Sequence, residues 1–207
     1  MIRATEQQWF AERGQLFLRW MRSLLFITGA LAVCYVALTL LHARLYQAAA
    51  DNALDQQMNA TERGTGEHKA SLPTTPPREG DLLGRIEIPR LGMKLAILEG
   101  TTSQTLRLGV GHIGGTALPG ATGNIGIAGH RDTFFRALKD IRTGDEIQIQ
   151  AAAGLSRFNV DQIQIVDPGD VGVLAQSPES AITLVTCYPF HYIGAAPKRF
   201  IVHAHKE

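Results

Sequence analysis

The stretch Ala181 to Phe190, AITLVTCYPF, decides how the rest of the chain is interpreted. The apolar and β-branched run Ile182–Thr186 predicts a buried β-strand. Pro189 cannot continue a central strand, so we expect the strand to end near Cys187. A side chain at a strand end can leave the core and face a cleft. Cys187 is therefore either a buried structural thiol, as many free cysteines are, or a nucleophile.

Composition narrows the classes of protein that the chain can represent. The chain has 207 residues, with 20 Lys and Arg against 19 Asp and Glu, so its charge gives no reason to expect a nucleic-acid partner. Its two cysteines, Cys34 and Cys187, are too few for a disulfide framework. No cysteine or histidine pair has the spacing of a structural zinc site.

The N-terminal part predicts a membrane anchor. Residues 23–41, SLLFITGALAVCYVALTLL, carry no charge, and 19 helical residues span about 28 Å, close to the hydrocarbon core of a bilayer. A cleaved signal peptide would have a shorter apolar region of about 7–15 residues. Four arginines precede the span and only Arg44 follows closely. We therefore expect a cytoplasmic tail over 1–22, a transmembrane signal anchor over 23–41 and an extracytoplasmic remainder.

Residues 42–80 are typical of a tether. The helix could continue to Met58, because the sequence is rich in Ala, Gln and Leu. From Asn59 the composition turns polar, and Pro73, Pro76 and Pro77 favour extended chain.

The pattern changes to short strands in residues 81–207. A shift of the alternation between Phe158–Val160 and Ile163–Ile165 predicts a bulge near Gln162. Thr101–Leu108 has room for one helical turn, and Thr133–Lys139 fits a short amphipathic helix. Many short strands with glycine-rich turns predict a mainly β domain, a small closed barrel or a sandwich. The predicted strands are Arg85–Pro89, Met93–Leu98, Asn124–Gly129, Glu146–Gln150, Phe158–Ile165, Ile182–Cys187 and Arg199–His205.

A cysteine nucleophile needs a partner, because a free thiol is only a few per cent ionised at about pH 7. His130 follows the glycine-rich strand 124–129 and is one candidate. Arg199 begins the last strand, where a guanidinium could hold a carbonyl oxygen and stabilise an oxyanion. Taken singly, His130 is better explained as a hydrogen-bonded structural histidine, and Arg199 as a solvated arginine at a strand end.

Together these residues resemble a family. Thr183-Leu184-Val185-Thr186-Cys187 resembles the TLxTC signature of sortases, the membrane-anchored cysteine transpeptidases of bacterial surfaces. Gly129-His130-Arg131 resembles the segment with their catalytic histidine, and Lys198–Val202 resembles the segment with their arginine. The resemblance covers about residues 81–207, and the continuation Cys-Tyr-Pro-Phe is most similar to class D.

The resemblance implies a closed eight-stranded β-barrel with short helices, preceded by one transmembrane helix, and the catalytic residues His130, Cys187 and Arg199. Cys187 would attack the threonine carbonyl of an LPxT-type sorting signal on a surface protein and form a thioester. His130 would act as general acid and then as base, and Arg199 would stabilise the oxyanion. The acceptor would be an amine of the cell envelope, on a cell-wall precursor or another protein. The chemistry requires no metal or cofactor.

Several alternatives stay open. An extracytoplasmic cysteine protease would form the same acyl-enzyme, and a non-catalytic anchored binding module would not need Cys187. His112 and His191 could line a groove. The segment Leu72–Thr75 mimics LPxT and is either a proline-rich linker or a lid over the site. A metal site is a further alternative; its candidate ligands are His112, His130, Cys187, His203 and His205.

Overall fold

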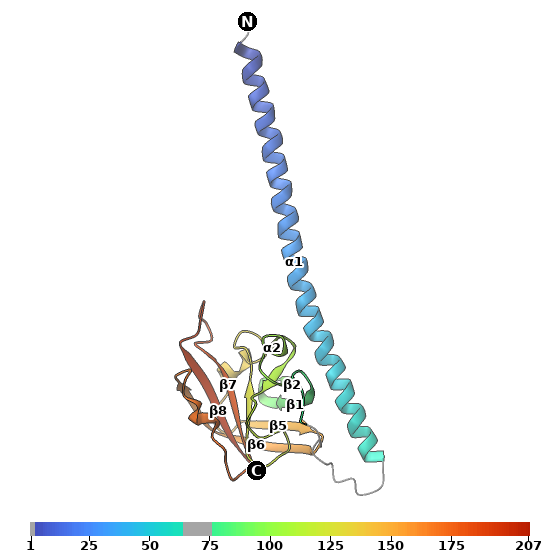
Figure 1. Cartoon of the computed structure of the whole chain (residues 1–207), viewed down its shortest axis with the longest axis vertical. Coiled ribbons are helices and arrows are strands. Elements are labelled where there is room, and N and C mark those ends of the chain that lie inside the picture. The colour runs from blue at the N-terminus through green and yellow to red at the C-terminus, as the bar shows by residue number, and fades with distance from the viewer. Residues whose placement is uncertain (1–2, 64–75) are drawn as a thin grey trace. The chain divides into compact units, whose positions relative to one another are not determined.

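The computed structural model describes residues 3–63 and 76–207, which form one long helix and one β-barrel (Figure 1). The segment Leu72–Thr75 lies outside the described residues. The chain divides into two compact units, 1–44 and 45–207.

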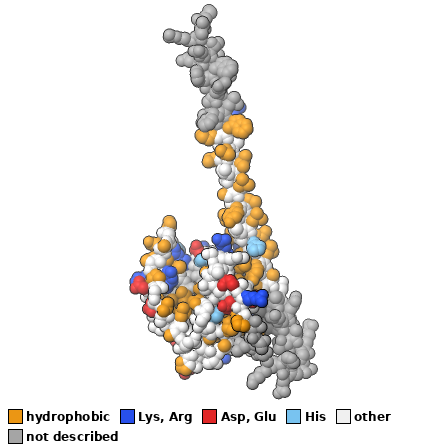
Figure 2. All heavy atoms as spheres, viewed as in Figure 1, with side chains coloured by type: hydrophobic (Ala, Val, Ile, Leu, Met, Phe, Trp, Pro, Cys, Tyr) orange, Lys and Arg blue, Asp and Glu red, His pale blue; other side chains and the backbone are white. Residues whose placement is uncertain are grey.

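The helix α1 runs from Arg3 to Arg63. It continues five residues beyond Met58, because Gly64 is the first glycine or proline after Gly29. Within it, Arg19–Ala50 is long and apolar enough to cross a membrane. Figure 2 shows hydrophobic side chains along this part of the helix, and large apolar residues from Trp20 to Leu45 are exposed.

Residues 82–206 contain the strands of a closed barrel, which confirms the predicted fold. The order around the barrel is β1-β2-β3-β4-β7-β8-β6-β5, with β5 pairing back to β1. The pairs β2–β3 and β4–β7 are parallel, and the others are antiparallel. The strands are β1 (Leu82–Ile88), β2 (Met93–Glu99), β3 (Val110–His112), β4 (Asn124–Ala128), β5 (Glu146–Ala151), β6 (Gly154–Val166), β7 (Ala181–Tyr188) and β8 (Lys198–Lys206).

The structure confirms the predicted bulge and one of the two predicted short helices. The register of β6 against β8 shifts between Val160 and Gln162, which confirms the predicted bulge. The helical turn in 101–108 is α2 (Thr105–Leu108). The α-helix predicted over Thr133–Lys139 is wrong: the segment begins with turns and continues as the 3₁₀ helix η2 (Arg136–Asp140). Such a short segment gains too few hydrogen bonds to offset α-helix nucleation. The 3₁₀ helices η1 (Pro89–Leu91) and η3 (Val171–Leu174) were not predicted.

Strands β4 and β7 turn one face to the barrel core and the other outward, and this determines on which side Cys187 lies. Ile125 and Ile127 of β4, with Ile182 and Leu184 of β7, point into the barrel core and are essentially inaccessible. Because side chains alternate along a strand, Cys187 falls on the opposite, outer face. The core therefore holds both strands while leaving Cys187 on the outside of the barrel.

An ion pair fastens η1 to the turn before β5. The Arg90 guanidinium donates through Nε to Oδ1 of Asp145 and through Nη2 to Oδ2, the latter at 2.6 Å. The Arg142 backbone N–H also donates to Asp145 Oδ2, at 2.8 Å. Asp145 is only 7 % exposed, so its charge depends on these partners. The hydrogen bond from Arg90 in particular holds the pKa of the Asp145 carboxyl below its ordinary value.

Replacing Asp145 by asparagine is expected to lower the free energy of unfolding by roughly 1–3 kcal/mol at pH 7, because charge-assisted hydrogen bonds are lost. A depressed folded-state pKa stabilises the protein fully above the ordinary aspartate pKa, and this contribution disappears as the pH falls through the depressed value. Denaturant unfolding of the full chain in detergent should therefore show a gap between wild type and Asp145→Asn that narrows on acidification. Asp167→Asn, in an exposed pair with Lys198, is the control with little effect. A gap that is constant with pH would contradict the role of the charge.

Candidate functional site

The candidate site lies at one end of the parallel pair β4–β7. Asn124 is opposite Ala181, and Ala128 is opposite Val185. The Gly129 N–H donates to the Val185 carbonyl at 3.1 Å, so the pairing continues past the end of β4. Extending this register by two residues brings His130 beside Cys187.

The antiparallel pair β7–β8 brings the third residue to the same place. Cys187 is directly opposite Arg199, and opposed residues project from the same face of a sheet. Arg199 donates through Nη1 to the carbonyls of Ala196, at 3.3 Å, and Lys198, at 3.0 Å. A guanidinium has five N–H groups, and these two bonds use only Nη1. The three predicted residues thus come from the ends of three adjacent strands.

The three candidate side chains differ in solvent exposure. Cys187 and Arg199 are half-buried, and His130 is exposed. Cys187 is a free thiol. Cys187 is therefore not fully buried, and all three side chains are at least partly accessible to solvent.

The two threonines of the TLVTC stretch have separate structural roles that the sequence did not reveal. Thr186 is buried, and its hydroxyl donates to the Gly129 carbonyl at 2.7 Å. Thr183 is also buried and donates to Asn124 Oδ1 at 2.8 Å. Each hydroxyl ties β7 to β4, and the first bond lies one residue before His130.

The loop between β6 and β7 is fastened over the outer face of these strands. Asn124 Nδ2 donates to the Ala175 carbonyl at 3.1 Å, and His203 Nε2 lies 3.3 Å from the Val173 carbonyl. Gly126 has no room for a side chain, since a Cβ there would be 2.9 Å from Thr116 Cγ2 and 3.1 Å from Leu174 Cδ2. The outer face of β4 is therefore covered at Gly126, and the strand ends beyond it carry the candidate site.

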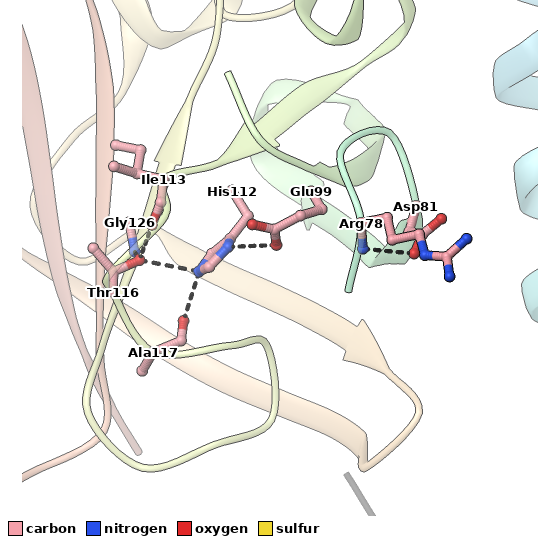
Figure 3. Close-up of polar contacts among 8 residues, drawn as sticks. All are labelled: Arg78, Asp81, Glu99, His112, Ile113, Thr116, Ala117 and Gly126. Carbon is pink, nitrogen blue, oxygen red and sulfur yellow. Dashed lines mark hydrogen bonds and ion pairs between the residues drawn. The ribbon is translucent and has the colours of Figure 1, made fainter. Parts of the chain in front are cut away.

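His112 is not a groove residue, so that prediction is wrong (Figure 3). It is only 2 % exposed, with Nδ1 at 2.8 Å from Glu99 Oε2 and Nε2 at 3.1 Å from the Ala117 carbonyl. A carbonyl oxygen only accepts hydrogen bonds, so Nε2 carries a proton. Nε2 also lies 3.0 Å from the Thr116 hydroxyl, which accepts the Gly126 N–H at 3.0 Å. His112 thus connects the end of β2 to the middle of β4.

The same close-up includes the turn by which the chain reaches β1 (Figure 3). The Arg78 backbone N–H donates to Asp81 Oδ2 at 2.8 Å. The Gly80 N–H donates to the Glu99 carbonyl, and the Glu99 N–H donates to the Asp81 carbonyl. The described chain preceding β1 is therefore tied to the strand that supports His112.

The histidines proposed as metal ligands do not come together. Within the described residues, no three His, Cys, Asp or Glu side chains are grouped as a metal site would need. Both ring nitrogens of His112 already have partners, and His205 Nδ1 faces Asp161 at 3.2 Å. His191 is exposed in the β7–β8 loop.

Comparison with known proteins identifies the family. A sortase domain model matches residues 86–207. Sortase D of Bacillus subtilis is 35% identical over 151 residues, which cover 72% of this chain and 75% of that protein. The chain belongs to the sortase family. Sortases are cysteine transpeptidases, and this sortase is therefore an enzyme rather than a binding module.

Solved sortase structures agree with the fold. The Sortase D5 transpeptidase of Clostridium perfringens superimposes with a TM-score of 0.62 at 26% identity, covering 79% of this chain and 97% of the other. Sortase C of Clostridium perfringens, solved with the C-terminal cell wall sorting motif, gives a TM-score of 0.59 at 28% identity, covering 76% and 90%. The predicted resemblance to sortases, including class D, is thus confirmed.

Proposed function

We propose that this sortase uses Cys187, His130 and Arg199 to cleave an LPxT-type sorting signal of surface proteins and to transfer it to an amine of the cell envelope. The observation that carries the proposal is the strand register. Cys187, a half-buried free thiol, is opposite Arg199, and the β4–β7 register extended by two residues aligns it with the exposed His130, which supports the proposal. A thiol can act as the nucleophile, an imidazole as general acid and base, and a guanidinium can stabilise an oxyanion, so the three groups together can perform acyl transfer from a peptide.

In the first half-reaction, the thiol proton of Cys187 has passed to His130, and the resulting thiolate attacks the threonine carbonyl carbon and forms a C–S bond. The negative charge that develops on the carbonyl oxygen is stabilised by Arg199. The C–N bond to the next residue then breaks, and His130 gives a proton to the leaving amine.

In the second half-reaction, the acceptor amine attacks the thioester carbonyl and transfers a proton to His130. The C–S bond breaks and the thiolate is restored. The exposure of His130 allows both the leaving amine and the incoming amine to reach it.

The apolar segment of α1 supports an anchored arrangement. In this proposal, residues 1–22 are cytoplasmic, 23–41 cross the cell membrane once, and 42–80 tether the catalytic domain, 81–207, outside. The arginine excess before the span supports this orientation.

Mass spectrometry of the full chain in detergent, incubated with LPxTG and LPxTA peptides, tests the proposal. We expect a peptide adduct on Cys187 that passes to an added amine such as triglycine. An adduct resolved by water alone would favour the protease alternative. No adduct with either peptide would contradict the LPxT assignment.

A further inference from the structure

Arg131, the residue after His130, is bonded to the loop that joins the Cys187 strand to the Arg199 strand. This β7–β8 loop comprises residues 189–197. Arg131 Nη1 donates to the Pro189 carbonyl at 3.0 Å. Nη2 donates to the carbonyls of Tyr192, at 2.8 Å, and Gly194, at 3.1 Å.

The middle of the loop gains little from burial. Ile193 is fully exposed, Tyr192 is 47 % exposed, and His191 and Gly194 are exposed as well. The Arg131 guanidinium also lies 5.8 Å from the centroid of the Tyr192 ring. Hydrogen bonds from a charged donor are about twice as strong as neutral ones, so these contacts restrain the middle of the loop, where the side chains are exposed.

The geometry suits arginine in particular. A guanidinium is a planar fork of five donors that is always charged, so one side chain can bind three carbonyls that converge on it. A lysine ammonium is a compact point charge on a flexible stem and cannot reproduce this arrangement.

His130 lies between two ties to the β7–β8 hairpin. On its N-terminal side, the Gly129 carbonyl accepts the Thr186 hydroxyl at 2.7 Å. On its C-terminal side, Arg131 binds the loop. Thr186 precedes Cys187 directly, and the loop leads to Arg199. Without the hydrogen bonds of Arg131, the C-terminal side of His130 is no longer bonded to the β7–β8 loop. The loop that connects Cys187 to Arg199 also loses these bonds.

We propose that Arg131 is a positioning residue, which fastens the β7–β8 loop to the end of β4 and thereby keeps His130 aligned with Cys187 and Arg199. The proposal rests on the proposed function for its consequence in catalysis, whereas the tie itself stands on the contacts alone.

The test compares Arg131→Gln and Arg131→Lys with Arg157→Gln, in the full chain in detergent. Arg157 is an exposed arginine on β6 paired with Glu146 and is the matched control. We expect Arg131→Gln to lower kcat for transfer of an LPxTG peptide to triglycine by about 10- to 100-fold, with a smaller change in KM, because small misplacements of reacting groups have effects of this size. Arg131→Lys should recover only part of the loss. Amide hydrogen exchange should rise in 190–197 and not across the barrel.

Unchanged exchange in the loop, or unchanged kcat despite faster exchange, would overturn the proposal. Faster exchange across all strands would also overturn it, since Arg131 would then stabilise the whole barrel. If the wild type forms no adduct with the peptide, the proposed function fails. In that case the proposal for Arg131 is tested by the rate of Cys187 alkylation by iodoacetamide, measured as a function of pH. A pH profile that differs between wild type and Arg131→Gln supports the positioning role of Arg131, and an unchanged profile overturns it.

Discussion

Replacing Cys187 by alanine is expected to abolish transfer of the LPxTG peptide, lowering kcat/KM on the order of 10⁴-fold or more. In the proposed mechanism the acyl group is carried by the Cys187 sulfur, and the alanine variant has no thiol opposite Arg199 to take its place. The measurement is product formation by the full chain, together with the mass of the protein after incubation with peptide.

Cys34→Ala is the matched control, because Cys34 is the second cysteine of the chain and is exposed on α1. It should keep full activity and still acquire the adduct. Transfer by Cys187→Ala that exceeds the rate without enzyme would contradict the assignment of the nucleophile.

Replacing His130 by glutamine is expected to lower kcat by about 10²- to 10⁴-fold, the usual contribution of a general acid and base. An ester in place of the scissile amide has a leaving group that needs less protonation. Acylation by such an ester should therefore be impaired much less than acylation by the amide peptide. For each substrate, the reaction is stopped at successive times and the rate of adduct formation on Cys187 is measured.

His205→Gln is the control for this prediction. His205 is exposed on β8 opposite Ala181, at the other end of the strand pair from Cys187. Its substitution should change neither substrate's rate. An equal loss with the ester and the amide in His130→Gln would contradict a role in protonating the leaving group.

The alternation of apolar and polar residues was sufficient to predict most strands of the barrel. Alternating apolar residues identified strands such as Glu146–Gln150, which is observed as Glu146–Ala151, and the change of parity identified the bulge beside Gln162. Strand β3 was missed because it has only three residues, Val110–His112, with a glycine in the middle. Three residues are too few to establish an alternation.

The candidate site was predicted only in part. Cys187, His130 and Arg199 were named from motifs. Arg131 was quoted only as part of the histidine motif, and no role was predicted for Arg131 or Asn124. Their partners are backbone carbonyls and a threonine hydroxyl at least 49 residues away in sequence. Periodicity reports which face of an element is apolar, and it carries no information on such distant polar partners.

By itself, the sequence determined all the strands except β3, the apolar N-terminal helix and the identities of the candidate reactive residues, because these depend on the order of side chains along the chain. Only the tertiary structure decided that β4 runs parallel to β7 and that β8 pairs with β7, which brings His130 and Arg199 to Cys187. It also decided that His112 is buried while His130 is exposed. His112 is the last residue of β3 and His130 follows β4, and both strands contain glycine. Their exposure differs because Glu99, Thr116 and Ala117 surround the ring of His112.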